Sequence, residues 1–183
     1  MSRKKVYAAD LFCGAGGTST GLLNAAKELG LNVKLIAVNH WDMAIATHSL
    51  NHPGVTHYQS DLEKVDPRQV VPGGKLELLV ASPECTHFSK ARGGKPMSKQ
   101  SRASVKYILR WVGALEVKNV IIENVSEFMD WGPLHRTHSN GCTREGKCLK
   151  GCHFEKPIKN RKGEYFYRFV RSMEKHGYTV KWR

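Results

Sequence analysis

Apolar runs and polar stretches alternate along the chain as buried strands and amphipathic helices do in α/β proteins. The apolar runs predict strands over residues 6–12, 33–38, 56–59, 76–81, 119–123 and 178–182. The pattern between and after them predicts helices over residues 18–29, 41–50, 101–115 and 164–176. This alternation favours right-handed crossovers, and therefore an α/β fold with a doubly wound, mostly parallel sheet covered by helices on both faces.

The first predicted strand leads into the glycine-rich stretch F-C-G-A-G-G, which a helix follows. Gly14, Gly16 and Gly17 fall in this turn, and Thr18 or Ser19 is expected to begin the helix. In doubly wound sheets ligands bind beyond the carboxyl ends of the strands, and glycines let the backbone approach them closely. Many α/β domains use such glycines only to pack a helix against the sheet, so the turn alone is consistent with a cofactor pocket or with a packing device.

The length of 183 residues suits a single domain, which we expect to span residues 1–183. A basic stretch rich in Cys and His at about residues 134–163 is expected to be irregular and inserted into it. No apolar run is long enough for a membrane span or a signal peptide, and the five cysteines form no disulfide framework. These features predict a soluble, cytoplasmic protein.

The formal net charge of +13 favours a polyanionic partner, although a basic solvated surface is its simplest explanation. The charge is concentrated in two places. Residues 89–110 contain seven Lys or Arg and no acid, and residues 134–183 contain thirteen Lys or Arg against four acids. Such a distribution is typical of a surface that contacts nucleic-acid phosphates.

Two chemically versatile residues follow predicted strands. Cys85 stands in the stretch S-P-E-C, where a lone cysteine is commonly a small buried hydrophobe. Glu123 ends the run N-V-I-I-E, where desolvation would raise its pKa and let it donate a proton, while helix capping or pairing with a lysine is the alternative.

Taken together, F-x-G-x-G-G, S-P-E-C and E-N-V resemble the motifs of the cytosine-5 DNA methyltransferase family, in the same order and at similar intervals. The closing G-Y-T-V is similar to the entry into that family's sixth strand. The resemblance covers nearly the whole chain. It implies a Rossmann-like S-adenosylmethionine-dependent methyltransferase fold and a DNA (cytosine-5-)-methyltransferase of the kind found in restriction-modification.

The resemblance also implies roles for individual residues. Cys85 would attack carbon 6 of a flipped cytosine, and Glu123 would hydrogen-bond ring nitrogen 3 and the exocyclic amine. Trp41 would stack on the adenine of S-adenosylmethionine, and Asp61 would accept from the adenine amino group. The remaining residues expected to bind the cofactor lie at the ends of the first, second and fourth predicted strands: Phe12, Gly14, Gly16, Gly17, Asn39, His40 and Ser82.

The chain departs from the family pattern at three places. His40 stands where the family carries an acidic residue on the cofactor ribose, and Glu84-Cys85-Thr86 replaces the common Pro-Cys-Gln. The family's arginine motif, target recognition region and C-terminal helix are not found before Arg183. From this we expect a sheet that is incomplete at its C-terminal edge and a missing segment or second polypeptide that carries the recognition region.

Two stretches are expected to be irregular, residues 82–100 and residues 132–163, and they contain basic and metal-ligating residues. The family's mobile catalytic loop would correspond to residues 89–100, and the residues expected to contact double-stranded DNA are Lys90, Arg92, Lys95, Lys99 and Arg102. His138, Cys142, Cys148, Cys152 and His153 could supply zinc ligands, but their spacing matches no strong zinc signature. We therefore expect no metal site.

Two other functions remain open from the sequence. A transfer-RNA cytosine-5 methyltransferase would share the fold and the motifs, although RNA is the less favoured partner. A catalytically inactive module that binds nucleic acid and cofactor would keep the pocket without turnover.

Overall fold

The computed structural model describes the backbone of residues 5–83, 99–138 and 153–182, and the side chains of residues 5–83, 104–133 and 158–182. The chain divides into two compact units. The first comprises Met1–Glu84 and Ser104–Glu123, and the second comprises Cys85–Ala103 and Asn124–Arg183. Each unit is considered by itself below.

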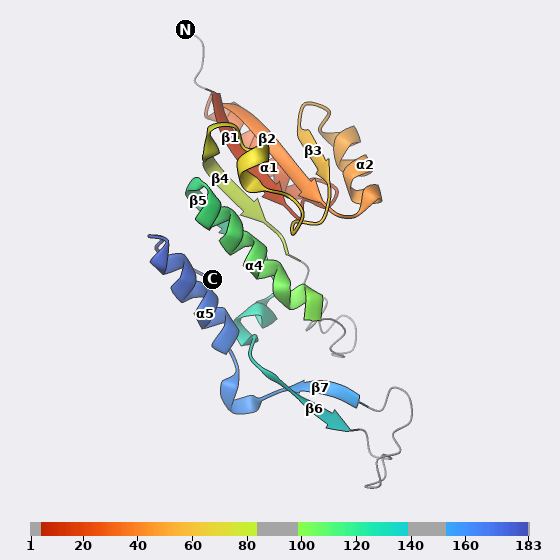
Figure 1. Ribbon diagram of the computed structural model, residues 1–183. Helices are drawn as coiled ribbons and strands as arrows, with labels where there is room; N and C mark the ends of the chain where they lie inside the picture. The colour runs from red at the N-terminus through yellow and green to blue at the C-terminus, as the bar shows by residue number, and fades with distance from the viewer. Residues whose placement is uncertain (1–4, 84–98, 139–152, 183) are drawn as a thin grey trace. The chain divides into compact units, whose positions relative to one another are not determined.

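The first unit is built on a five-stranded parallel sheet with strand order β3-β2-β1-β4-β5 (Figure 1). The strands are β1 (Lys5–Leu11), β2 (Asn32–Asn39), β3 (Thr56–Gln59), β4 (Lys75–Ala81) and β5 (Glu116–Ile122). Leu11 pairs with Val38 of β2 on one side and with Ala81 of β4 on the other. The expected doubly wound α/β fold is confirmed, and each of the first five predicted strands overlaps an observed one.

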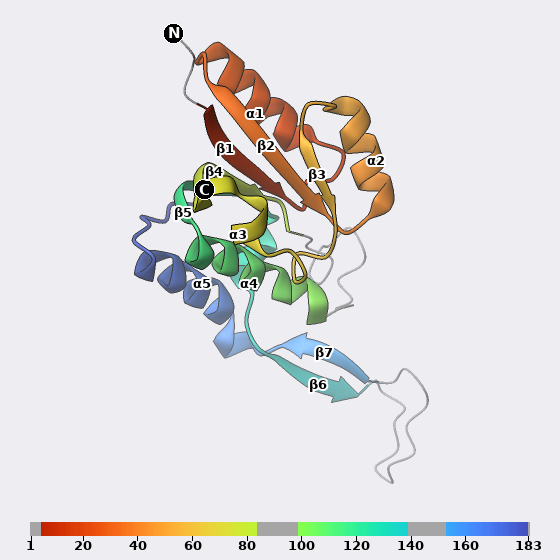
Figure 2. The ribbon, with the colours of Figure 1, turned by 45° about the horizontal axis from the view of Figure 1, so that its top comes forward.

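The central strands are apolar because both of their faces are covered. The last four residues of β1 and four successive residues of β2 are buried, Asp10 among them. Figure 2 shows α1 (Gly17–Glu28) and α2 (Asp42–Asn51) on one side of the sheet, with α3 (Pro67–Val70) and α4 (Lys99–Ala114) on the other. This division follows from right-handed crossovers in a sheet whose strand order reverses at β1.

The short helix α3 and the 3-10 turn η1 (Pro72–Gly74) were not predicted. Asp66 caps α3 by accepting a hydrogen bond from the Arg68 amide at 3.0 Å, and Pro67 occupies the first helical position. This Asp-Pro pair is a recognised start signal that the sequence offered.

The second unit contains the 3-10 turn η3 (Ser126–Asp130), a two-stranded antiparallel hairpin, the 3-10 turn η4 (Lys159–Arg161) and α5 (Glu164–Lys175). Helix α5 buries Phe166, Phe169, Val170 and Met173, which recur at helical spacing on one face. Phe128 of η3 packs edge to face on Phe166, with ring centroids 5.3 Å apart. Aromatic packing therefore holds η3 against α5.

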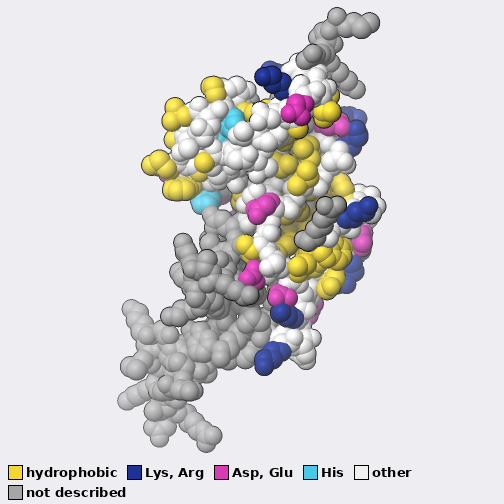
Figure 3. Space-filling model, turned by 180° about the vertical axis from the view of Figure 1, so that it is seen from behind, with side chains coloured by type: hydrophobic (Ala, Val, Ile, Leu, Met, Phe, Trp, Pro, Cys, Tyr) yellow, Lys and Arg dark blue, Asp and Glu magenta, His cyan; other side chains and the backbone are white. Residues whose placement is uncertain are grey.

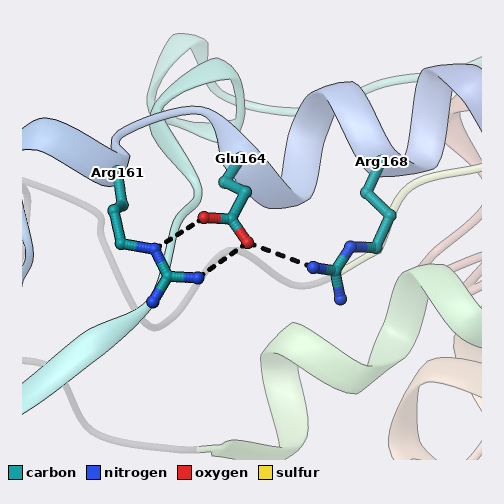
Figure 4. A network of polar contacts seen from close by, with 3 residues as sticks. All are labelled: Arg161, Glu164 and Arg168. Carbon is teal, nitrogen blue, oxygen red and sulfur yellow. Dashed lines mark hydrogen bonds and ion pairs between the residues drawn. The ribbon is translucent and has the colours of Figure 1, made fainter.

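The start of α5 is tied to η4 by a network of charges (Figure 4). Glu164 accepts two hydrogen bonds from Arg161, at 2.7 and 3.0 Å, and a third from Arg168 at 3.1 Å. The Arg161 hydrogen bonds lower the pKa of the Glu164 carboxyl group. Part of the positive charge in the basic C-terminal third is thus compensated locally.

Two expectations about the C-terminal half are wrong. Residues 132–163 are not wholly irregular, because β6 (Leu134–His138) pairs with β7 (His153–Pro157). Residues 178–182 form no strand: the Tyr178 amide hydrogen-bonds to the Met173 carbonyl at 3.2 Å, and the Trp182 ring packs edge to face on Phe166. These contacts fold the segment back onto α5 instead of extending it.

Candidate cofactor and catalytic site

The candidate site lies at the carboxyl edge of the sheet, where backbone hydrogen bonds continue past the ends of the strands. The amides of Phe12 and Ser60 donate to Val38 and Asn39 of β2, both at 2.9 Å. The amide of Ser82 donates to Leu11 of β1 at 3.2 Å, and that of Glu123 donates to Ala81 of β4 at 3.0 Å. The first residues beyond β1, β3, β4 and β5 are therefore fixed to a neighbouring strand without using any side chain.

The glycine turn has a backbone that few residues adopt. Phe12 has φ 61°, the only positive φ of a described residue other than glycine, and Gly14 and Gly16 have φ 52° and 98°. Gly16 caps α1 without a side-chain hydrogen bond, and the helix begins at Gly17, one or two residues before the expected start at Thr18 or Ser19. A Cβ added at Gly14 or Gly17 would meet no atom of the described residues within 4 Å, so these residues leave space open beside the turn.

Helix α2 holds the turn from the other side. Asn51 donates from Nδ2 to the Ala15 carbonyl at 2.9 Å, and His52 Nε2 lies 3.1 Å from the Gly16 carbonyl. A Cβ at Gly16 would lie 2.7 Å from the His52 ring, closer than real Cβ atoms approach other heavy atoms. Glycine is required here both by its φ and by the packing of α2.

A chain of buried polar groups runs beneath the turn through four elements. Ser19 Oγ of α1 donates to Asp10 Oδ2 of β1 at 2.6 Å, and His48 Nε2 of α2 lies 3.0 Å from Ser19 Oγ. His48 Nδ1 in turn lies 2.8 Å from His57 Nε2 of β3. Asp10, Ser19 and His48 are all fully buried.

Burial shifts the pKa values of these groups strongly. Desolvation raises the pKa of Asp10 to about 6, although the Ser19 hydrogen bond opposes the shift. Desolvation, helped by neighbouring His57 and His52, lowers the pKa of His48 to about 4, and desolvation also lowers that of His57. Near neutral pH the chain therefore combines an Asp10 that is mainly ionised with neutral His48 and His57.

The cysteine within the turn is not a nucleophile. Cys13 is buried, and burial together with the nearby Asp10 carboxylate raises its pKa to about 12. Because a thiolate is the reactive form of cysteine, Cys13 remains an inert thiol that packs against Ala37 and Ile45.

The other expected cofactor residues also lie at this edge. Asn39 ends β2, and its Oδ1 accepts a hydrogen bond from the Trp41 amide at 2.9 Å, while His40 is exposed between them. The Trp41 side chain is 59% exposed and is available for stacking. Asp61 follows β3 and forms an ion pair with Lys64 at 3.4 Å.

Of the two expected catalytic residues, the structure describes one. Glu123 follows β5 directly and is exposed, so the described residues do not provide the desolvation expected for its carboxylate. Cys85 lies outside the described residues, four positions beyond the last residue of β4. The structure thus brings Phe12, Ser82 and Glu123 to adjacent strand ends and leaves Cys85 as a prediction.

The basic residues between positions 89 and 110 do not all have the same role. Lys90, Arg92 and Lys95 lie outside the described residues, as do the side chains of Lys99 and Arg102 in the first turns of α4. Arg110 at the other end of the cluster donates from Nη1 to the Leu62 and Glu63 carbonyls, at 3.1 and 2.7 Å. It therefore anchors α4 to the segment after β3.

Among the described residues on the face shown in Figure 3, acidic and basic side chains are interspersed. Among the residues that the structure describes, no group of His, Cys, Asp or Glu could hold a metal ion. The Cys142, Cys148 and Cys152 thiols lie outside that part of the chain. None of the helices in the described ranges is both long and apolar enough to cross a membrane.

The sequence analysis named Ser19 only as a possible start of the helix, and it did not single out the other residues that support the turn: Asp10, His48, Asn51, His52 and His57. Asp10 offered one signal, since it is a carboxylate inside the apolar run V-Y-A-A-D-L-F. A charge within a buried strand needs a partner. No spacing rule, however, links it to side chains on α2 and β3.

The strand order and the glycine turn define a doubly wound α/β domain, a class in which ligands bind where the strand order reverses, here between β1 and β4. The model of the C-5 cytosine-specific DNA methylase family matches residues 6–137, and the chain belongs to this family. The resemblance seen in the motifs is thereby confirmed. S-adenosylmethionine, the cofactor expected from it, is confirmed for the family.

The chain is also similar to individual members. It is 34% identical over 118 residues to the Type II methyltransferase M.HgiGI of Herpetosiphon aurantiacus, covering 63% of this chain and 87% of that protein. It is 31% identical over 121 residues to the Type II methyltransferase M.AgeI of Thalassovita gelatinovora, covering 63% of this chain and 27% of the relative. The chain thus spans about a quarter of the length of M.AgeI.

Among solved structures, a mutant of Spodoptera frugiperda DNMT2 aligns with 67% of this chain and 36% of its own, at 23% identity and a TM-score of 0.49.

Proposed function

We propose that this chain provides the cofactor-binding and catalytic part of an S-adenosylmethionine-dependent DNA cytosine-5 methyltransferase. The proposal rests on the residues that lie at the carboxyl edge of the sheet, in a chain that belongs to the C-5 cytosine-specific DNA methylase family. There an unusually shaped glycine turn, an exposed tryptophan and an exposed glutamate follow β1, β2 and β5.

The residues at this edge fit the cofactor. The first amides of α1 have no acceptor within the helix and lie at its positive end, where the carboxylate of S-adenosylmethionine would bind. The open space beside Gly14 and Gly17 leaves room for the ligand against bare backbone. Trp41 would stack on the adenine, and Asp61 would accept from its amino group.

The remaining cofactor contacts would come from the ends of the central strands. Phe12 and Ser82 flank the point between β1 and β4 where the strand order reverses, and Asn39 and His40 follow β2. Neutral imidazole can hydrogen-bond hydroxyl groups, so His40 would contact the ribose with Asn39 beside it. When bound, the cofactor supplies a methyl group on a sulfonium sulfur.

The proposed reaction uses Cys85 and Glu123 on the cytosine. The Cys85 thiolate forms a bond to carbon 6, and Glu123 holds ring nitrogen 3 and the exocyclic amine as the ring gains electron density. Carbon 5 then takes the methyl group, and S-adenosylhomocysteine is released. A base removes the carbon 5 proton, the carbon–sulfur bond breaks, and the thiolate returns with the aromatic ring restored.

The proposed substrate is double-stranded DNA, with the target cytosine turned out of the helix. Lys90, Arg92, Lys95, Lys99 and Arg102 would contact its phosphates. We also propose that a second polypeptide or a further segment recognises the DNA sequence.

A covalent trapping experiment tests the function. The chain is incubated with S-adenosylmethionine and duplex DNA containing 5-fluorocytosine, whose fluorine blocks the last elimination step. We expect a denaturant-stable protein–DNA complex that is lost in Cys85→Ser, while both proteins bind S-adenosylhomocysteine equally in calorimetry.

Three outcomes would overturn the proposal. If the wild type binds the cofactor but forms no complex with DNA or RNA even when every plausible partner chain is added, the chain is a binding module. Trapping on 5-fluorocytosine RNA alone would replace DNA by RNA as substrate. Absence of cofactor binding would reject the proposed site itself.

A further inference from the structure

The buried polar chain beneath the glycine turn has one consistent direction of donation. The Ser19 hydroxyl gives its only hydrogen to Asp10 Oδ2, so Ser19 Oγ must accept from His48 Nε2. A neutral His48 that carries its hydrogen on Nε2 has a bare Nδ1, which accepts from His57 Nε2. The order is therefore His57 to His48 to Ser19 to Asp10.

This order connects the two ends of the proposed cofactor site. Ser19 lies in the first turn of α1, three residues after Gly16, while His57 lies in β3, whose carboxyl end leads to Asp61. His48 joins them from α2, and Asn51 at the end of that helix and His52 directly after it contact the carbonyls of Ala15 and Gly16. Replacing His48 would release the buried link while leaving those two surface contacts in place.

Resting on the proposed function, we propose that His48 is a positioning residue for S-adenosylmethionine. It acts through Ser19 and Asp10 to hold the start of α1, and with it the Gly14–Gly17 turn, in the shape that binds the cofactor. His48 touches no cofactor itself, because it is fully buried behind the turn.

Each surrounding group is compatible with this role. The titratable groups that face His48 or Asp10 are His52 on α2, His57 on β3 and Cys13 in the turn. Asp10 Oδ1 is buried and has no hydrogen-bond partner among the described residues. The orientation of the Asp10 carboxylate therefore depends on Ser19, and that of Ser19 depends on His48.

Binding of S-adenosylhomocysteine, which carries no transferable methyl group, tests the inference without turnover. By calorimetry, His48→Phe and Ser19→Ala should each weaken binding by about tenfold, roughly the effect of one hydrogen bond. His48→Gln keeps an amide donor toward Ser19 and should stay within about threefold of wild type. Ile108→Val, a buried change in α4 outside the polar chain, controls for lost stability.

Nitrogen-15 spectra of labelled histidines give a second readout. Both His48 and His57 should carry hydrogen on Nε2 at neutral pH, and a His48 with hydrogen on Nδ1 would overturn the order of donation. If Ser19→Ala and every folded His48 variant bind as the wild type does, the inference fails and the proposed function stands. If the wild type itself does not bind, the proposed function fails.

Discussion

Replacing Asp10 by Asn should change how the free energy of unfolding depends on pH. The reason is that Asp10 stabilises the fold at low pH and His48 stabilises it at high pH. The pKa of Asp10 is raised from 3.8 to about 6, so its contribution to the free energy of unfolding is complete below pH 3.8 and is lost as pH rises through 6. The pKa of His48 is lowered from 6.5 to about 4, so its contribution is complete above pH 6.5 and is lost as pH falls through 4.

The two contributions are similar in size. Each pKa moves by somewhat more than two pH units, which at about 1.36 kcal/mol per unit gives roughly 3 kcal/mol for each group. In the wild type they largely cancel between pH 4 and 6. Asp10→Asn keeps the shape of the side chain and removes only its titration, so the His48 contribution is unmasked.

Urea unfolding of the whole chain, followed by circular dichroism between pH 4 and 8, measures the effect. Relative to wild type, Asp10→Asn should lose about 3 kcal/mol of unfolding free energy between pH 7 and pH 4. His48→Gln should change in the opposite direction and gain stability toward acid. Parallel curves for all three proteins would refute the assignment of opposed linkages to this pair.

Three further predictions concern single positions. Gly16→Ala should lower the free energy of unfolding by about 1–3 kcal/mol and abolish cofactor binding, because alanine is strained at the positive φ of this position and its Cβ clashes with the His52 ring. Gly21→Ala in α1, where no described atom lies near the added Cβ, should instead raise the free energy of unfolding by about 0.5–1 kcal/mol in the same urea titration. Glu123→Gln should lower turnover about a hundredfold or more with S-adenosylhomocysteine affinity unchanged, and an equal loss in both would contradict its action on the base. Arg102→Gln should reduce the slope of log Kd for DNA against log salt by about 1, whereas Arg110→Gln should leave that slope unchanged and lower the urea midpoint, since Arg110 holds the Leu62 and Glu63 carbonyls.

Much of the sheet could be predicted because its strands are buried on both faces. The run L-L-V-A of β4 and the run L-I-A-V of β2 have no polar interruption, and a glycine or polar residue marks where each loop begins. The start of β5 was predicted three residues late, since Glu116 and Lys118 are exposed polar residues on a strand that pairs only with β4 in the described part of the chain. Strand ends that face solvent carry little apolar signal.

The errors arise where tertiary contacts outweigh local pattern. The alternation in Y-T-V-K-W is typical of a strand, yet Trp182 packs on Phe166 and the segment turns back onto α5. The hairpin of β6 and β7 was missed because H-R-T-H and H-F-E-K have no clear apolar alternation. For the candidate site, the strand ends were predictable from topology, whereas the support from α2 needed the fold.

The backbone hydrogen bonds just beyond the strand ends affect which sequence changes the carboxyl edge of the sheet can accept. Phe12, Ser60, Ser82 and Glu123 are each held by a main-chain amide. At Ser60, Ser82 and Glu123 any residue except proline can keep this anchor, whereas the positive φ of Phe12 restricts the choice at that position. Side chains at the carboxyl edge of the sheet can therefore be substituted while the backbone there keeps its shape. The side chains that face a ligand at the carboxyl edge of the sheet can therefore change without a change in the fold.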